Sequence, residues 1–166
     1  MGAGYHGGFG STKGSSKKDK NRDHKSQRKH YTREQLIDFI NGKTTISSAI
    51  ADKILKGMIK ISVLGDELFE RALGVSSEVV GLAIDNKIYI RASSSTIYSD
   101  IVHEGTHAMD YLQGLPYEKI SSRDGEIRAY IAEHQFQKVS GLIVQFTNED
   151  EIRVHVWLNY KLRGKK

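Results

Sequence analysis

Apolar side chains recur every three or four residues over several segments of the chain, and most of these segments end at a glycine. Such spacing gives a helix one apolar face, and a glycine past the last turn is a common helix end. Acceptor side chains at several starts are typical of helix caps. The predicted helices run from the capping residue Thr32 to Gly42, from Thr45 to Leu55, from Glu67 to Leu73 behind a capping Asp66, from Thr96 to Gln113, and from Arg123 to Val139.

Other segments have the pattern of strands. Residues 58–64 alternate well enough for one strand, and two apolar runs at 79–84 and 87–91 flank Asp85 and Asn86. A two-residue turn of this type between apolar runs predicts a hairpin. Because the strand at 87–91 comes just before the helix that starts at Thr96, we expect its edge to be available for main-chain pairing with an extended peptide.

The C-terminal pattern supports two interpretations. Residues 142–146 resemble a strand, and apolar residues alternate with polar ones from 151 to 162, which favours a strand there as well. However, Asn148 followed by three acidic residues is typical of a helix start. We favour the strand for 151–162.

The first 30 residues differ from the remainder in composition. They contain eight Lys and Arg and only two Asp, a net charge of +6, so residues 31–166 sum to −1 of the total +5. Rich in Gly, Ser and Lys, residues 1–30 are predicted to be a disordered leader or linker before a single domain at 31–166. A basic arm at residues 13–29 that binds nucleic acid is the alternative, though few aromatic residues accompany the charges.

The helix from Thr96 contains His103, Glu104 and His107, which form an H-E-x-x-H motif. Residues four apart on a helix lie on one face, so both imidazoles can bind one metal ion, and Glu104 then lies where it can take a proton from an activated water. The chain has no Cys, which leaves His, Asp and Glu as metal ligands. A catalytic zinc needs a third protein ligand, and Glu126 and Glu133, on one face of the next long helix, are the candidates.

These segments resemble the zincin metallopeptidases of the gluzincin kind. The similarity rests on H-E-G-T-H-A-M-D at 103–110, a short loop, and E-I-R-A-Y-I-A-E at 126–133, in which a downstream Glu in an E-x-x-A frame completes the zinc site. It implies an α+β, zincin-like domain, with the H-E-x-x-H helix and a Glu-bearing helix packed on a small, mostly antiparallel sheet. The resemblance also implies that His103, His107 and Glu126 bind Zn²⁺ and that Glu104 is the general base.

Three further residues are candidates for supporting roles. Asp110, three residues after His107, can accept a hydrogen bond from the other ring nitrogen of a zinc ligand. Tyr130, with His134 and His155 as alternatives, can stabilise the oxyanion of the transition state. Glu133 is the second choice for the third ligand, and His134 is the nearest candidate for a fourth ligand if the zinc were structural.

The opening G-A-G-Y-H-G-G-F-G-S-T-K-G-S is similar to the glycine-rich junctions before C-terminal toxin domains of bacterial polymorphic toxins. This resemblance implies a secreted or delivered metallopeptidase toxin with a peptide or protein substrate and a dedicated immunity protein; a cytoplasmic location is not excluded. No apolar run is long enough for a membrane span. The alternative function is a basic-armed nucleic-acid-binding domain whose metal site is non-catalytic or absent.

Overall fold

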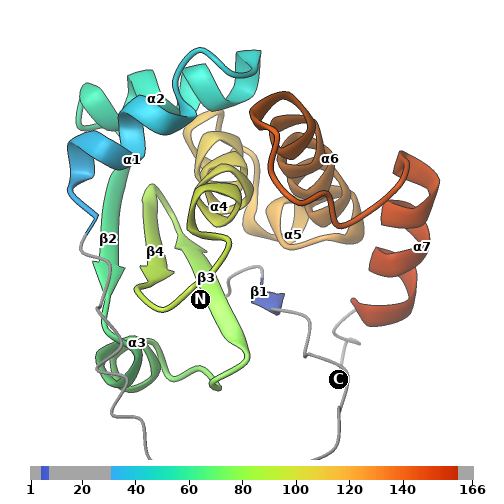
Figure 1. Cartoon of the computed structure of the whole chain (residues 1–166). Helices are drawn as coiled ribbons and strands as arrows, with labels where there is room; N and C mark the ends of the chain where they lie inside the picture. Colours follow the sequence, from blue (N-terminus) through green and yellow to red (C-terminus); the bar gives the residue numbers. More distant parts are fainter. Residues whose placement is uncertain (1–4, 8–30, 161–166) are drawn as a thin grey trace, which may run out of the picture.

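The computed structural model describes residues 5–7 and 31–160, in which a small mixed sheet lies beside a group of helices (Figure 1). The strand order is β1-β3-β4-β2, with β3 antiparallel to both β1 and β4 and with β2 parallel to β4. The architecture is therefore α+β, as the sequence predicts. The strands are β1 (Tyr5–Gly7), β2 (Lys60–Leu64), β3 (Val79–Ile84) and β4 (Lys87–Arg91).

The hairpin of β3 and β4 confirms the prediction from the two apolar runs. Asp85 in its turn has φ of 54°, a left-handed conformation that Asp and Asn tolerate better than most residues. β4 is an interior strand, paired on one edge with β3 and on the other with β2. The prediction that β4 offers a free edge to a peptide is therefore wrong. The pattern located the strand but gave no information on its place in the sheet.

The helices predicted from apolar spacing are present with closely matching bounds. Capping boxes at Thr32 and Thr44 start the first two, and Gly74 and Gly141 end two others in the left-handed conformation. Asp66 is the first residue of its helix rather than the cap, which is Gly65. The helices are α1 (Arg33–Ile40), α2 (Thr45–Leu55), α3 (Asp66–Leu73), α4 (Ile97–Leu112), α5 (Tyr117–Ile120), α6 (Arg123–Ser140) and α7 (Glu149–Asn159).

The main core lies between one face of the sheet and the helices α1, α2, α4 and α6. Ala83, Ile88 and Ile90 of the sheet belong to the same apolar cluster as buried residues of these helices. The opposite face packs on α3, where Phe69 is fully buried against residues of β3. Because successive residues of a strand point to opposite faces, the apolar residues of the hairpin serve both layers. α4 is thereby held between the sheet on one side and α6 on the other (Figure 1).

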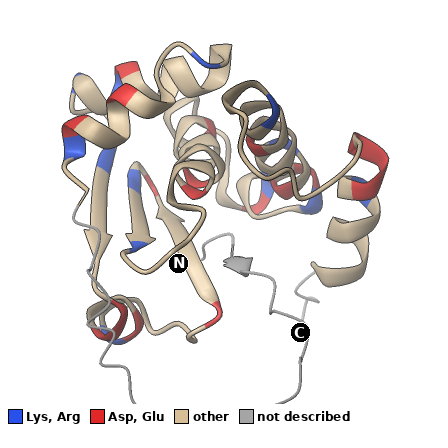
Figure 2. Cartoon of the chain, viewed as in Figure 1, with Lys and Arg blue, Asp and Glu red and all other residues tan. Residues whose placement is uncertain are grey.

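The C-terminal part differs from the favoured interpretation. Residues 149–159 form the helix α7, and residues 142–146 form no strand. Asn148 caps α7 by accepting a hydrogen bond from the Glu151 amide, and three acidic residues occupy the first turn (red at the start of α7 in Figure 2). α7 buries Ile152 and Val156, which are four residues apart, and the apolar Val154 between them is exposed.

Within the described ranges, no helix combines the length and the apolar character that a membrane crossing requires.

Candidate metal centre

α4 has a buried surface that is polar along one side. His103, Glu104 and His107 are each at most 1% exposed, in a helix of sixteen residues whose last turn includes the exposed Tyr111. The first turn is tied to the preceding loop by Asp100, which accepts hydrogen bonds from the hydroxyls of Ser94 and Thr96. Imidazoles and carboxylates are buried at a high free-energy cost unless they are paired or bind a metal, so this surface requires a chemical partner.

That partner is α6, which lies beside α4 (Figure 1). Ser122 caps α6 by accepting a hydrogen bond from the Gly125 amide at 3.1 Å. Gly125 lies so close to α5 that a Cβ there would be 1.9 Å from the carbonyl oxygen of Ile120. A residue with a side chain cannot adopt this corner without moving the backbone. The corner fixes the start of α6 and therefore the position of Glu126, the next residue.

Glu126 lies between the two histidines of α4. Its Oε2 is 3.5 Å from His103 Nε2 and its Oε1 is 3.6 Å from His107 Nε2. One nitrogen or oxygen atom from each residue lies within 4.8 Å of the other two. Tetrahedral zinc with bonds of about 2.0–2.1 Å requires neighbouring ligand atoms about 3.4 Å apart. These three residues, called the His–His–Glu group below, therefore fit a small metal ion with little movement. Figure 2 shows acidic residues on both helices that carry the group.

The charges of the group are strongly coupled. Burial opposes ionisation of Glu126, but the two imidazoles outweigh it and lower the pKa of Glu126 to about 2. Burial alone would lower the pKa of His103. Hydrogen bonds to Glu126 and Glu133 and the charge of Glu104 outweigh burial, so the pKa of His103 lies well above its ordinary value. A metal ion that binds here replaces the proton of His103, because a ligating imidazole must be neutral.

Glu133 contacts His103 but is not part of the His–His–Glu group. Its Oε2 lies 3.1 Å from His103 Nδ1, the ring nitrogen that faces away from Glu126. Its Oε1 accepts a hydrogen bond from Gln137 at 3.0 Å, and Gln137 also donates to Ser99 at 3.3 Å. A carboxylate on the second nitrogen of a metal-binding histidine fixes the orientation of the ring and makes it a stronger ligand. Of the two carboxylates that the sequence proposed as third ligand, Glu126 alone is within the group.

Asp110 does not bond to a histidine, contrary to the prediction from its spacing. Its Oδ2 accepts hydrogen bonds from Arg128, at 2.6 Å from Nη2 and 3.2 Å from Nε. Neither ring nitrogen of His107 has a hydrogen-bond partner among the described residues. Arg128 is a stronger competitor for this carboxylate because it offers a planar pair of donors. Asp110 therefore links α4 and α6 at the edge of the site.

Glu104 faces the sheet at Gly81, within β3. A Cβ on Gly81 would lie 2.9 Å from Glu104 Cγ and 3.0 Å from Oε1, so only glycine leaves room for this carboxylate. Glu104 follows His103 directly and is fully buried. Its charge contributes to the raised pKa values of His103, Tyr130 and Tyr160. Glu104 is thus beside the His–His–Glu group.

Two tyrosines, Tyr130 and Tyr160, lie next to each other, and Tyr130 lies beside His103. The Tyr130 ring contacts the His103 ring edge-on with centroids 4.5 Å apart, and the Tyr130 hydroxyl is 3.2 Å from that of Tyr160. Burial raises the pKa of both hydroxyls well above the usual range, and the charges of Glu126 and Glu104 act in the same direction. Both hydroxyls therefore remain protonated and can act as hydrogen-bond donors.

Tyr160 is a site residue that the sequence did not indicate. It follows α7 and is held there by Arg123, the first residue of α6, whose Nε donates to the Tyr160 carbonyl at 2.9 Å. The same guanidinium stacks on Trp157 at 4.0 Å and donates to its carbonyl. The sequence contains one signal for this position, the helix start at Asn148, because a helix from there ends beside α6 at residue 160. The strand interpretation of 151–162 does not place Tyr160 near the candidate metal centre.

The other sequence-based candidates lie elsewhere. His155 packs on Tyr130 at 5.4 Å between ring centroids, and its Nδ1 lies 3.1 Å from the side-chain nitrogen of Asn159, within α7. His134 is buried but is not part of the His–His–Glu group. The described residues therefore provide three ligands for a metal and no fourth. Residues 13–29, the candidate nucleic-acid arm, lie outside the described residues.

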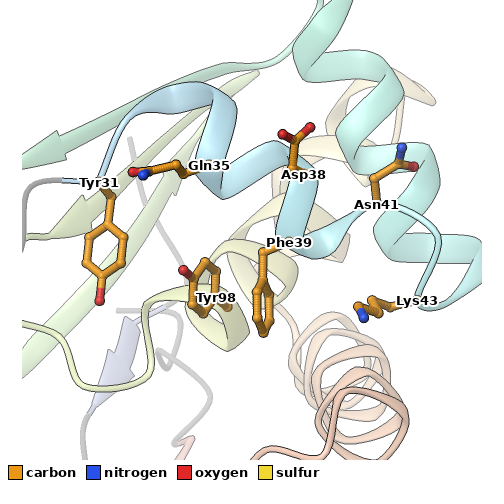
Figure 3. Close-up of a pocket in the computed structure, with 7 residues that line it drawn as sticks. All are labelled: Tyr31, Gln35, Asp38, Phe39, Asn41, Lys43 and Tyr98. Carbon is orange, nitrogen blue, oxygen red and sulfur yellow. The ribbon is translucent and has the colours of Figure 1, made fainter.

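An open pocket of about 690 Å³ lies at α1 and the start of α4 (Figure 3). Phe39 and Tyr98 stack there with centroids 3.8 Å apart, and Tyr31 stands at its side. The pocket contains no residue of the His–His–Glu group and none of the candidates from the motif. Its aromatic side chains belong to the packing of α1 on α4, and it is separate from the metal centre.

Comparisons of this chain with protein-family models, with curated protein sequences and with solved structures found no match. The α+β architecture is established by the coordinates, whereas the zincin-like fold stays a prediction from the motif.

Proposed function

We propose that this chain is a zinc-dependent peptidase that hydrolyses peptide bonds at the His–His–Glu group. The observation that carries the proposal is the convergence of buried His103, His107 and Glu126 from two helices, with the Glu126 oxygens 3.5 and 3.6 Å from the two Nε2 atoms and with buried Glu104 next to His103 in the chain. Three protein ligands with one open position are typical of catalytic zinc, whereas structural zinc usually has four. The sequence spacing alone could not distinguish these two cases.

The residue types fit zinc and would also fit Fe(II), and the H-E-x-x-H frame with its adjacent Glu104 favours zinc. Two imidazoles and one carboxylate are ligands that zinc prefers, and a site without thiolates excludes Fe–S clusters. When bound, zinc would polarise the carbonyl of a peptide bond and lower the pKa of a water molecule. Glu133 contributes by orienting His103, and Glu126 contributes a negative charge without neutralising the ion completely.

Glu104 is the proposed general base. Its carboxylate takes a proton from the attacking water as the oxygen–carbon bond forms, and it delivers that proton to the nitrogen as the carbon–nitrogen bond breaks. The products are a carboxylic acid and an amine, so the atoms balance without another reactant. The burial of Glu104 against Gly81 holds the carboxylate in a single position, which general-base catalysis requires.

The hydroxyl pair of Tyr130 and Tyr160 is the proposed donor to the carbonyl oxygen as it gains negative charge. Both groups are protonated at neutral pH, and Tyr130 contacts a proposed zinc ligand. Tyr160 is the better donor, because Tyr130 is 2% exposed whereas Tyr160 is partly accessible. A preorganised donor at this position stabilises the transition state more than the substrate.

The role of the chain as a delivered bacterial toxin, with an immunity protein as partner, stays a prediction from the glycine-rich opening. It adds no residue to the mechanism.

The decisive experiment measures zinc and cleavage in the same preparations. Wild type, His107→Ala and Glu104→Gln are purified without added metal and analysed for zinc per chain. Each is then incubated with a peptide library prepared from a whole proteome, and new N-termini are sequenced by mass spectrometry. We expect about one zinc in wild type and Glu104→Gln and little in His107→Ala. New termini should appear with wild type and fall by about 10²–10⁴-fold with Glu104→Gln.

Two results would contradict the proposal. A folded wild type without zinc, even after incubation with ZnCl₂, would exclude the metal site. Cleavage by Glu104→Gln at the wild-type rate would exclude the mechanism. Circular dichroism of all three proteins controls for misfolding.

A further inference from the structure

The outer edge of β3 is covered by a distant part of the same chain. Tyr5–Gly7 form β1, which pairs antiparallel with β3 on the side away from β4. β1 is the part of the first 30 residues that the structure describes, and it lies in a segment for which the sequence predicts no ordered element. The partners along the strands are Tyr5 with Leu82, His6 with Gly81, and Gly7 with Val79, with a register shift after His6.

This pairing occurs at the point of β3 nearest to the proposed base. His6 is the partner of Gly81, and Gly81 is the residue whose missing side chain makes room for Glu104. The main chain of β1 therefore runs past the candidate metal centre, one strand spacing from Gly81, about 4.8 Å. The opposite edge of the sheet, formed by β2, is separated from Gly81 by the whole of β4. Of the two sides of β3 in the described sheet, the side away from β4 therefore brings a paired strand to the residue that faces Glu104.

A strand edge binds extended peptides through main-chain hydrogen bonds, whatever their side chains. A peptidase must present the main chain of its substrate to the catalytic groups, and an extended strand beside Gly81 would do so. β1 occupies that position in the structure. A pairing of three residues with a register shift makes few hydrogen bonds, so a longer extended peptide is able to displace it.

We propose that Tyr5–Gly7 is an internal ligand of this peptide-binding edge, and that it competes with the peptide substrate for β3. The proposal rests on the proposed peptidase function for the consequence, but the binding itself does not depend on catalysis. The occupant is a segment of this chain, and the ligand that it excludes is an extended peptide main chain.

The test uses the full chain with two substitutions, His6→Pro and Gly7→Pro, made together. Proline has no amide hydrogen, and successive amides of a strand point in opposite directions, so the pair removes whichever donor faces β3. The matched control carries Ser15→Pro and Ser16→Pro, which lie in the leader but outside β1. All proteins for binding also carry Glu104→Gln, so that the probe is not cleaved.

The first readout is binding of a fluorescein-labelled peptide with the sequence of residues 1–10, measured by anisotropy. We expect it to bind the His6→Pro, Gly7→Pro chain and to bind the Ser15→Pro, Ser16→Pro chain much more weakly, because β1 fills the edge there. A probe that itself carries both prolines should bind neither. Equal binding of the probe to both chains, or to neither, would overturn the inference even if the zinc site and the peptidase activity are confirmed.

The second readout is kinetic and uses the same two pairs of substitutions with Glu104 intact. An internal competitor raises the apparent KM and leaves kcat unchanged. If β1 covers the edge nine-tenths of the time, its removal lowers KM about tenfold. An unchanged KM in a protein whose edge binds the probe would show that substrates use another surface, and would overturn the competition. Absence of cleavage in every variant would contradict the proposed function, and the anisotropy result would still decide whether β1 occupies the edge.

Discussion

The two sides of α4 differ in almost every property although they belong to one helix. Toward α2 and the sheet, α4 presents apolar residues and Gly105, where an added Cβ would lie 2.7 Å from Ile50. Toward α6 it presents the equally buried imidazoles of His103 and His107, and the buried carboxylate of Glu104 lies at the border, against Gly81 of β3. The apolar side gains free energy from burial, whereas the charged side costs free energy unless it is paired. The first side therefore holds the helix in place, and the second is maintained for its chemistry.

The largest expected effect is on the apolar side. Ile50→Ala should lower the free energy of unfolding of the metal-free protein by about 2–5 kcal/mol, because Ile50 is fully buried and its loss leaves a cavity behind Gly105. Urea denaturation measures this change. Zinc per chain should stay the same under native conditions. Leu55→Ala, in the same helix but 59% exposed, is the control and should change the value by less than about 0.5 kcal/mol. Loss of zinc in Ile50→Ala would show that the two sides are not separable.

The next effect belongs to the charged side. Tyr160→Phe should lower kcat by about 10²–10³-fold, because one donor to the developing oxyanion is lost, with little change in unfolding free energy or zinc content. Tyr111→Phe, on α4 and 43% exposed, is the control. Steady-state kinetics on a peptide identified by terminal sequencing measures both. A Tyr160→Phe protein with wild-type kcat would leave Tyr160 a packing residue and direct attention to Tyr130.

The same contrast explains how much of the molecule the sequence predicts. α2 and the β3–β4 hairpin have the expected bounds because their apolar residues meet one core. The motif brought His103 and His107 together through spacing on a helix, and a short connection to α6 made Glu126 and Glu133 the candidates for the third ligand. The sequence favours Glu126, and the structure brings it to the two histidines, but the Gly125 corner that holds it there depends on a contact with α5. Such tertiary contacts leave no periodic signal.

α7 shows the opposite case. Of its alternating apolar residues, Ile152 and Val156 pack on α6, whereas Val154 and Leu158 are exposed and serve no core. Alternation normally indicates a strand with one buried face. Here the cap at Asn148 and the acidic first turn were the more reliable signals, because they describe local hydrogen bonds and not burial. The incorrect strand also removed Tyr160 from consideration.

The smallest expected effect distinguishes two carboxylates between α4 and α6, Glu133 of α6 and Asp110 of α4. Glu133→Gln keeps the shape of the side chain but removes the charge behind His103, and it should weaken zinc binding by about 10–100-fold. Asp110→Asn is the matched change, and because Asp110 pairs with a partly exposed Arg128, it should cost less than about 1 kcal/mol of stability and leave zinc affinity unchanged. Competition with a chromogenic chelator measures both affinities. Equal losses in the two variants would mean that general electrostatics, and not orientation of His103, controls the site.

The absence of a side chain at Gly125 lets the backbone at the start of α6 pack directly on α5. The α5 carbonyl of Ile120 fills the space beside Gly125, so the backbone of α5 sets where α6 begins, one residue before Glu126. This contact is between main-chain segments and involves none of the His–His–Glu side chains. A design for another metal could therefore exchange the ligand side chains and keep the corner that places residue 126.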